Sequence, residues 1–418
     1  MTLFILSVRR LPLLVLALAL ALSVSPAVDL RSEERADLSR LVVVGDSLAA
    51  GYMNDSLLAA QQVGSFASLI AAQAAVDLPL PLIASPGIPN VIVSVDPGPP
   101  PIIIRAPGVS TGRLNPMVQA MNLAVPGHTV HDALVRRPSL PIDGVGSQVE
   151  ILTDLVLGLP GLLGGVAKSQ VEWAEALAPS TILLWLGSND VLGAVFAATP
   201  LLITPPAAFD ADFTEVITRL ESTGAQLVVA NVTDVTRVPF LTPAEQVAVL
   251  IGQPLALIGP VLGIGAGDAV TPQGLALVPA ILANPALGPL PGNVVLTFAE
   301  AETIRGAIAA YNDIIAARAE QFGATLVDVH SLVESLHEKG YVVNGHRLTT
   351  AFLGGLFSLD GGHPSLTGHA IIANEVIKTM NRQTGAAIPP LSVSRVAAAD
   401  PLVQLLTRNP GGLTIQAR

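Results

Sequence analysis

The sequence has 418 residues, of which 51% are hydrophobic and only 13% charged, and its formal net charge is −11 at pH 7. The absence of cysteine excludes a disulfide framework, a thiolate metal site, a cysteine nucleophile and a lipid-modified cysteine anchor. The acidic balance disfavours binding to nucleic acid or anionic lipid, and the length suits one large domain with insertions or two domains.

The first segment of the chain has the pattern of an export signal. Arg9 and Arg10 precede an apolar run over residues 11–22, and residues 25–27 (Ser-Pro-Ala) are small enough for a signal peptidase. We therefore expect residues 1–27 to be a signal peptide and the mature protein to be secreted or periplasmic. A retained membrane anchor is the alternative, although so short a run spans a bilayer poorly.

Five short apolar segments predict the strands of a mainly parallel sheet. They are apolar on both faces, which suits a sheet covered by helices on both sides. Stretches with helical spacing lie between them, so the order of elements predicts a three-layer α/β/α sandwich. The predicted strands are 41–45, 119–125, 181–187, 226–232 and 324–330, and the clearest helices are 166–178, 209–222, 299–322 and about 365–380.

Two connections are longer than a compact crossover needs. Residues 76–117 are rich in Pro and Gly and predict an irregular, extended excursion. Residues 241–295 have only Glu245 and Asp268 as charged residues and predict a set of short apolar helices. This insertion is either a subdomain that packs against the main core or a lid or acyl-binding cover over the site. Residues 385–418 form a weakly patterned tail, to which we assign no role.

The residues just after the predicted strands are candidates for chemistry, because ligands of doubly wound sheets bind at the carboxyl ends of the strands. Ser47 follows the first strand, Gly127 the second and Asn189 the third, while Asp360 and His363 lie beyond the last strand. A serine hydroxyl becomes a nucleophile when a histidine takes its proton and a carboxylate fixes the histidine tautomer. The spacing of three between the aspartate and the histidine allows that contact.

Each of these residues also has an ordinary structural interpretation. Ser47 could be a helix N-cap, Gly127 a turn glycine and Asn189 a turn residue. Asp360 could be a cap or loop carboxylate, and His363 a loop histidine. These alternatives stay open on the residues alone.

Polar residues near these positions are expected to have no catalytic role. Asp46 and Asp190 are interpreted as braces of their turns through backbone hydrogen bonds. His128 and His131 lack a carboxylate or third histidine at metal-binding spacing, so we expect solvated or hydrogen-bonded surface histidines and no metal site. His369, on the last predicted helix, is expected to be structural. No glycine-rich phosphate-binding loop is present, and no cofactor is expected.

Four motifs, in this order, resemble those of the SGNH/GDSL hydrolase superfamily of serine esterases and lipases. They are "VVVGDSLAAGY" (42–52), "NLAVPG" (122–127), "GSND" (187–190) and "DGGHP" (360–364). The resemblance implies a flavodoxin-like fold with a five-stranded sheet, in a hydrolase domain that we place at residues 38–384. The Gly-x-Ser-x-Gly elbow of the α/β-hydrolases is absent around the candidate serine, Ser47.

The resemblance implies roles for the candidate residues. Ser47, His363 and Asp360 would form the catalytic triad. The backbone N–H groups of Ser47 and Gly127 and the side-chain amide of Asn189 would form the oxyanion hole. The mechanism would run through an acyl-enzyme without metal or cofactor.

We therefore expect an exported serine ester hydrolase that acts on a small-molecule or lipid ester. The apolar insertion favours carboxylic esters with an acyl chain over deacetylation of polysaccharide as the reaction. It also favours a transient contact with a lipid interface. The alternatives are an acyltransferase or carbohydrate acetylesterase on the same fold, or a non-catalytic lipid-binding protein. The stretch 229–240 also resembles the family, so Asn231 or Asp234 could form the rear wall of the site. The sequence does not indicate the oligomeric state.

Overall fold

The computed structural model describes residues 36–139, 142–159 and 167–408. The predicted signal peptide, residues 1–27, lies outside the described residues, as do residues 409–418 of the predicted tail. Within the described part of the chain, no single helix is long and apolar enough to cross a bilayer. One pair of described helices is long and apolar enough only when the two are taken together, and they are bent by 109° relative to each other; these are residues 244–251 and 255–262.

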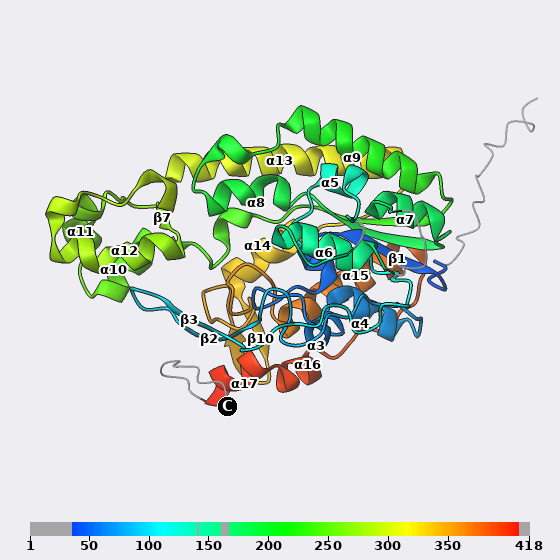
Figure 1. The fold of residues 1–418 in the computed structure, drawn as a ribbon, viewed down its shortest axis with the longest axis horizontal. Coiled ribbons are helices and arrows are strands. Elements are labelled where there is room, and N and C mark those ends of the chain that lie inside the picture. Colours follow the sequence, from blue (N-terminus) through cyan, green and yellow to red (C-terminus); the bar gives the residue numbers. More distant parts are fainter. Residues whose placement is uncertain (1–35, 140–141, 160–166, 409–418) are drawn as a thin grey trace, which may run out of the picture. The chain divides into compact units, whose positions relative to one another are not determined.

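A parallel sheet of four strands lies at the centre of the fold, in the order β1-β4-β5-β9 (Figure 1). The strands are β1 (Leu41–Gly45), β4 (Thr181–Trp185), β5 (Gln226–Ala230) and β9 (Thr325–Val327). Every residue of β1 and β4 is buried, which explains why these segments are apolar on both faces. Because the strands are parallel, their carboxyl ends lie along one edge of the sheet.

The segment 119–125, predicted as the second strand, forms only one bridge to the sheet, between Asn122 and Val43. The backbone N–H and C=O of Val43 each bond to this segment at 2.9 Å. The N–H of Val125 also donates to the carbonyl of Gly45 (3.1 Å), but the N–H of Gly45, which a second bridge would need, donates to the side chain of Gln170 (2.9 Å). The side chain of Asn122 bonds to the backbone N–H of Ala124 and to the carbonyl of Ala49. The α/β sandwich is thus confirmed, with four strands and one bridged segment in place of five strands.

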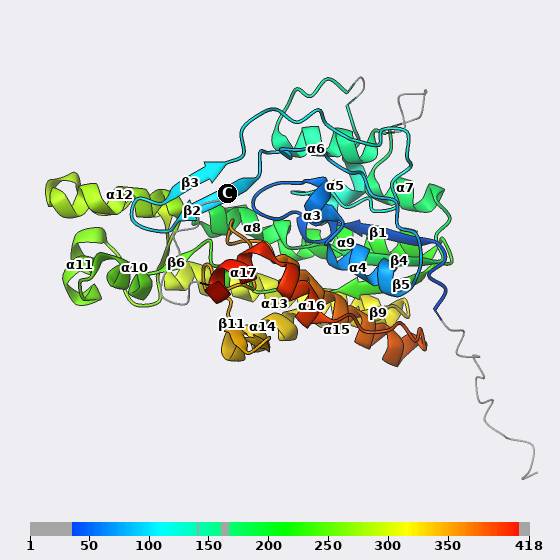
Figure 2. The same cartoon turned by 90° about the horizontal axis from the view of Figure 1, so that it is seen from below.

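Helices cover both faces of the sheet (Figures 1 and 2). The helices α5, α7, α9 and α13 lie on one face, and α4 and α15 lie on the other. All four helices predicted from the sequence are present, with ends that differ by a few residues. The helices of the main layers are α2 (Ser47–Ala50), α3 (Ala59–Gln62), α4 (Phe66–Gln73), α5 (Val130–Val135), α6 (Gln148–Leu157), α7 (Gln170–Ala176), α8 (Asn189–Phe196), η2 (Pro200–Leu202), α9 (Pro206–Glu221), η3 (Val235–Arg237), α13 (Phe298–Gln321), α14 (Val329–Lys339) and α15 (Leu366–Thr384).

The Pro- and Gly-rich excursion, residues 76–117, contains one antiparallel hairpin of β2 (Ile92–Asp96) and β3 (Ile102–Arg105). Arg105, at the end of β3, pairs with Asp55. This pair ties the excursion to the loop that follows the predicted nucleophile. A second hairpin, β10 (Tyr341–Val343) and β11 (His346–Leu348), follows α14.

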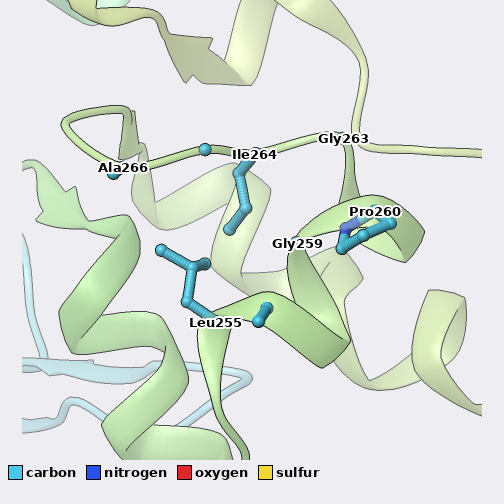
Figure 3. Close-up of a pocket in the computed structure, with 8 residues that line it drawn as sticks. Leu255, Gly259, Pro260, Gly263, Ile264 and Ala266 are labelled. Atoms are coloured by element: carbon cyan, nitrogen blue, oxygen red, sulfur yellow. The ribbon is translucent and has the colours of Figure 1, made fainter.

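The apolar insertion, residues 241–295, forms a subdomain with a hydrophobic core of its own. Its helices surround buried residues that include Val247, Leu262, Val270 and Val278. An open apolar hollow, lined by residues such as Leu255, Pro260 and Ile264, lies on its surface (Figure 3). The elements of this region are β6 (Thr242–Pro243), α10 (Ala244–Ile251), α11 (Leu255–Leu262), β7 (Ala269–Val270), α12 (Pro272–Ala283), η4 (Pro285–Leu287), η5 (Gly292–Val294) and β8 (Val295–Leu296).

The tail beyond residue 385 folds onto the start of α15. It forms α16 (Val393–Ala399) and α17 (Pro401–Arg408). Between them, the buried carboxylate of Asp400 accepts hydrogen bonds from the N–H and the hydroxyl of Thr367, in the first turn of α15 (2.9 and 2.8 Å). Its other oxygen accepts from the backbone N–H of Leu402 (3.0 Å). The tail therefore completes the N-terminus of α15.

Replacement of Asp400 by alanine is expected to lower the free energy of unfolding by about 1–3 kcal/mol, because two buried donors of Thr367 lose their acceptor. Urea unfolding followed by circular dichroism measures this loss. Asp143 offers a matched control, since it is exposed and accepts only from a neighbouring backbone N–H. Equal stability of the Asp400→Ala and Asp143→Ala variants would contradict the role of Asp400.

Candidate active site

Ser47 is the first residue of α2, directly after β1. The N-cap of α2 is Asp46, whose Oδ1 accepts a hydrogen bond from a backbone N–H two residues later (3.0 Å). The hydroxyl of Ser47 is therefore not occupied in capping the helix. A Cβ at Gly45 would lie 2.6 Å from the Cβ of Ala49, so glycine allows the helix to start this close to the strand.

The structure brings Ser47 together with His363 and Asp360. The Nε2 atom of His363 lies 2.9 Å from the Oγ of Ser47, and its Nδ1 lies 3.1 Å from the Oδ2 of Asp360. The three side chains thus form a continuous hydrogen-bonded row. With Nδ1–H donating to the carboxylate, Nε2 is left to accept a proton from the hydroxyl.

Backbone N–H groups hold the carboxylate of Asp360 in place. Its Oδ1 accepts from Gly362 and His363 (2.7 and 2.9 Å), and its Oδ2 accepts from Asp55 (2.7 Å) as well as from the imidazole. The loop that follows Ser47 therefore contacts the loop that carries the histidine. The ring of Tyr52, from the same loop, lies 4.8 Å from the imidazole ring.

The buried pair of His363 and Asp360 shifts the pKa of both groups. Burial raises the pKa of the Asp360 carboxyl, but the charge and hydrogen bond of His363 outweigh it and lower this pKa to about 2. Burial lowers the pKa of His363, but the charge and hydrogen bond of Asp360, with the charges of Asp46 and Asp55, raise it above its ordinary value. Burial also raises the pKa of Asp46 to about 7.

A pocket opens beside Ser47 and His363. Much of its wall is apolar and includes Leu48, Trp185, Leu192, Val238, Phe357 and Ile372. The one arginine that lines it, Arg237, is paired with Glu334 (2.8 Å) and Asp234 (3.4 Å). The pocket thus presents no unpaired cation. No residue of the insertion 241–295 lines it.

Two further predicted site residues, Gly127 and Asn189, lie close together in the fold. Gly127 has a φ of +88°, and a Cβ there would lie 2.7 Å from Val149, so the turn requires glycine. Asn189 is the first residue of α8, and its Nδ2 donates to the carbonyl of His128 (2.9 Å). The amide of Asn189 is therefore fixed against the residue that follows Gly127. The oxyanion role of both residues stays a prediction.

His128 is buried, and its expected place on the surface is therefore wrong. Its ring lies between Thr153 (2.8 Å) and Gln170 (3.0 Å), and burial lowers its pKa well below the ordinary value. His131 is exposed, as expected, and faces Asp212 (3.2 Å). Among the described residues, no group of three or more His, Asp and Glu side chains could hold a metal ion.

Of the remaining polar residues, His369 has the structural role that the sequence predicts, whereas the contact of Asp190 differs from the predicted one. His369 is buried, and its Nδ1 accepts from the backbone N–H of Phe66 (3.3 Å). Asp190 accepts from the backbone N–H of Val130 (3.1 Å), so it joins α8 to the start of α5 instead of bracing its own turn. Of the two candidates for the rear wall, Asp234 lines the pocket, whereas Asn231 bonds to Asp328 (2.8 Å) and does not line it.

Tyr52, Asp55 and Gln170 contact the site, and the sequence analysis misses them. Tyr52 is the last residue of the first motif and Asp55 lies three residues beyond it, so proximity to Ser47 in the sequence is a signal that could have found them. Gln170 has no such signal, because it lies in the first turn of an ordinary amphipathic helix far from the motifs.

Comparison with known proteins supplies a family. A family model described as GDSL-like lipase/acylhydrolase matches residues 41–376, which include all four motifs. No curated protein matches the chain. Similar solved structures include an α/β hydrolase enzyme from the metagenome of Lake Arreo, Spain (16% identity, 84% of this chain and 97% of that chain covered, TM-score 0.37). An acetylxylan esterase from Geobacillus stearothermophilus is also similar to this chain (12% identity, 83% of this chain and 96% of that chain covered, TM-score 0.37). So is a psychrotrophic esterase from Pseudoalteromonas sp. (13% identity, 82% of this chain and 97% of that chain covered, TM-score 0.34).

Proposed function

The chain belongs to the family of GDSL-like lipases and acylhydrolases, and on this basis we propose that it hydrolyses carboxylic esters through an acyl-enzyme formed on Ser47. The observation that carries the proposal is the pair of hydrogen bonds from Ser47 to His363 and from His363 to Asp360. A non-catalytic lipid-binding protein has no use for a base held against a hydroxyl, so this arrangement favours an enzyme.

In the proposed reaction, the hydroxyl of Ser47 attacks the ester carbonyl while Nε2 of His363 takes its proton. Asp360 stabilises the imidazolium that forms. The imidazolium then gives the proton to the departing alcohol, and the acyl group stays on the serine. Water follows the same route and releases the acid. An acyltransferase would share the first half of this sequence and use an alcohol in place of water.

The negative charge that develops on the carbonyl oxygen needs hydrogen-bond donors already in place. We propose the backbone N–H groups of Ser47 and Gly127 and the side-chain amide of Asn189. The amide carries two N–H groups, and one of them is held by the carbonyl of His128 (2.9 Å). The other is then free to donate to the substrate.

The walls of the pocket support an ester with an apolar acyl group. Side chains such as Leu48, Leu192 and Phe357 offer apolar contact, and Arg237 is already neutralised by Glu334 and Asp234. A carboxylate or phosphate on the substrate would have to compete for that arginine. A neutral acyl ester therefore suits the pocket better than an anionic one.

We also propose export of the protein and a transient contact of its insertion with a lipid interface. The arginines and the apolar run before residue 27 support export. The insertion exposes Val249 and Leu257 (70% and 63%), while both of its carboxylates, Glu245 and Asp268, accept backbone hydrogen bonds. An apolar surface with few charges favours a lipid interface over an ionic partner.

A panel of para-nitrophenyl esters from acetate to palmitate, with acetylated xylan beside it, tests the proposed function. Hydrolysis of the nitrophenyl esters but not of the xylan supports the acyl esterase. Release of acetate from xylan alone would favour the carbohydrate acetylesterase, and transfer to an added alcohol in preference to water would favour the acyltransferase. No reaction with any substrate would refute the proposal.

The pH dependence of kcat/KM is expected to follow the protonation of His363. The base must be neutral to take a proton, so activity rises with pH through the histidine pKa and is constant above it. Since its carboxylate neighbours raise this pKa above the ordinary value of 6.5, the midpoint is expected above pH 6.5. Initial rates with one nitrophenyl ester between pH 5 and 9 measure the profile, and a midpoint below pH 6 would contradict it.

Burial raises the pKa of Asp46 to about 7, within the pH interval of this experiment, so the Asp46→Asn variant is the control. An asparagine keeps the Oδ1 acceptor that caps α2 and removes the charge that helps to raise the pKa of His363. We therefore expect the pH dependence of kcat/KM to persist in this variant, with its midpoint at a lower pH than in the wild type. Loss of the pH dependence in this variant would instead identify Asp46 as the titrating group.

A further inference from the structure

A row of buried hydrogen bonds leads away from the turn before Ser47. The backbone N–H of Gly45 donates to the Oε1 of Gln170 (2.9 Å), and the Nε2 of Gln170 lies 3.0 Å from the Nδ1 of His128. The Nε2 of His128 lies 2.8 Å from the hydroxyl of Thr153, which donates to the carbonyl of Val149 (2.7 Å). The side chains of Gln170, His128 and Thr153 are almost completely buried.

The direction of every bond in this row is determined by its two ends. A backbone N–H can only donate, so the carbonyl oxygen of Gln170 faces Gly45 and its NH₂ faces His128. The Nδ1 of His128 must then accept, and its proton is on Nε2. The Nε2–H of His128 donates to the hydroxyl oxygen of Thr153, and the hydroxyl in turn donates to the backbone carbonyl of Val149. The row is thus fully satisfied with a neutral imidazole in a single tautomer.

His128 connects this row to the other proposed oxyanion groups. It directly follows Gly127 in the chain, and its carbonyl accepts from the amide of Asn189 (2.9 Å). Gly45 is two residues before Ser47. The ring and backbone of one buried histidine therefore join the three segments that carry the proposed donors.

We propose that Gln170 and His128 are positioning residues that set the relative placement of the Ser47, Gly127 and Asn189 donors. The inference rests on the proposed function, because it concerns the oxyanion site of the same reaction. Donors in such a site work only if they are already aimed at the oxygen when its charge develops. Small displacements of catalytic groups cost up to about 100-fold in rate. Loss of the row is therefore expected to lower kcat while KM changes little.

The test compares two buried glutamines in the full chain. Gln170→Met keeps the size of the side chain and removes both hydrogen bonds. Gln62→Met is the matched control, because Gln62 is also buried and makes two hydrogen bonds, with its Nε2 donating to Pro81 and its Oε1 accepting from Ile83 (2.9 Å each). We expect both variants to lower the melting temperature, and only Gln170→Met to lower kcat, by about 10- to 100-fold.

Two variants of His128 give a readout that a loss of stability alone does not move. His128→Leu removes the acceptor for Gln170, whereas the Oδ1 of asparagine in His128→Asn can take the place of Nδ1. We expect His128→Asn to recover part of the kcat that His128→Leu loses. If Gln170→Met fails to fold, Thr153→Val replaces it, with an expected loss of about threefold or more in kcat.

The outcomes separate this inference from the proposed function. No hydrolysis of nitrophenyl esters by the wild-type protein would refute the function and the positioning role with it. Hydrolysis by the wild type, with wild-type kcat in Gln170→Met and in Thr153→Val, would overturn the positioning role alone. An equal loss of kcat in Gln62→Met and Gln170→Met would also overturn it.

Discussion

Replacement of Ser47 by alanine is expected to lower kcat for ester hydrolysis by roughly 10⁶-fold. Without the hydroxyl there is no atom to carry the acyl group, and His363 has nothing to activate. The fold should persist, because Asp46 and not Ser47 caps α2. Steady-state hydrolysis and labelling by a fluorophosphonate probe measure the effect, and both signals should disappear together.

Ser56→Ala serves as the control for this variant. Ser56 is a buried serine nine residues further along the chain, and its hydroxyl contacts only a neighbouring carbonyl (3.4 Å). It should keep wild-type labelling and turnover. Persistent labelling of Ser47→Ala would show that another residue is the nucleophile.

Replacement of Asp360 by asparagine is expected to lower kcat by about 10⁴-fold with little change in KM. Each carboxylate oxygen accepts two hydrogen bonds, one pair from Gly362 and His363 and the other from Asp55 and the imidazole. An amide NH₂ in either place would face two donors. If the amide oxygen keeps the hydrogen bonds from the N–H groups of Gly362 and His363, the amide NH₂ faces the imidazole and donates to its Nδ1. The imidazole proton is then on Nε2, which can no longer accept the proton of the Ser47 hydroxyl.

The pH profile and a second buried aspartate make this test specific. The activity that remains in Asp360→Asn should have its midpoint at lower pH, because the charge that raises the pKa of His363 is gone. Asp154→Asn is the control, since Asp154 is buried, accepts from the backbone N–H of Ser139 (2.7 Å) and does not line the pocket. Equal losses of kcat in the two variants would contradict the role of Asp360.

The parts of the fold that depend on local pattern could be predicted from the sequence. Runs such as 41–45 and 181–185 are apolar on both faces because helices cover both sides of the sheet. The second predicted strand has the same apolar character, but the side chain of Gln170 takes the N–H of Gly45 that a second bridge would need, so only one bridge forms. Composition does not reveal that competition.

The groups that contact the site from a distance in the chain could not be predicted. Gln170 looks like any polar residue in the first turn of a helix, and its partners Gly45 and His128 are far from it in the sequence. The burial of His128 depends on the same packing. Asp400 lies in a tail without a clear pattern, and only the folded chain shows that it caps α15. Long-range hydrogen bonds leave no periodic signal.

The contact between Ser47 and His363 joins groups 316 residues apart in the chain. A contact between residues so far apart in the sequence closes a large loop, and the entropy of that closure opposes the contact until the two segments are brought together by other interactions. A chain that has collapsed around its strands but has not yet docked its last third holds an inert serine. Titration of the protein with an active-site reagent therefore counts molecules in which Ser47 and His363 are in contact, and recovery of that titre reports the docking of the two segments during refolding.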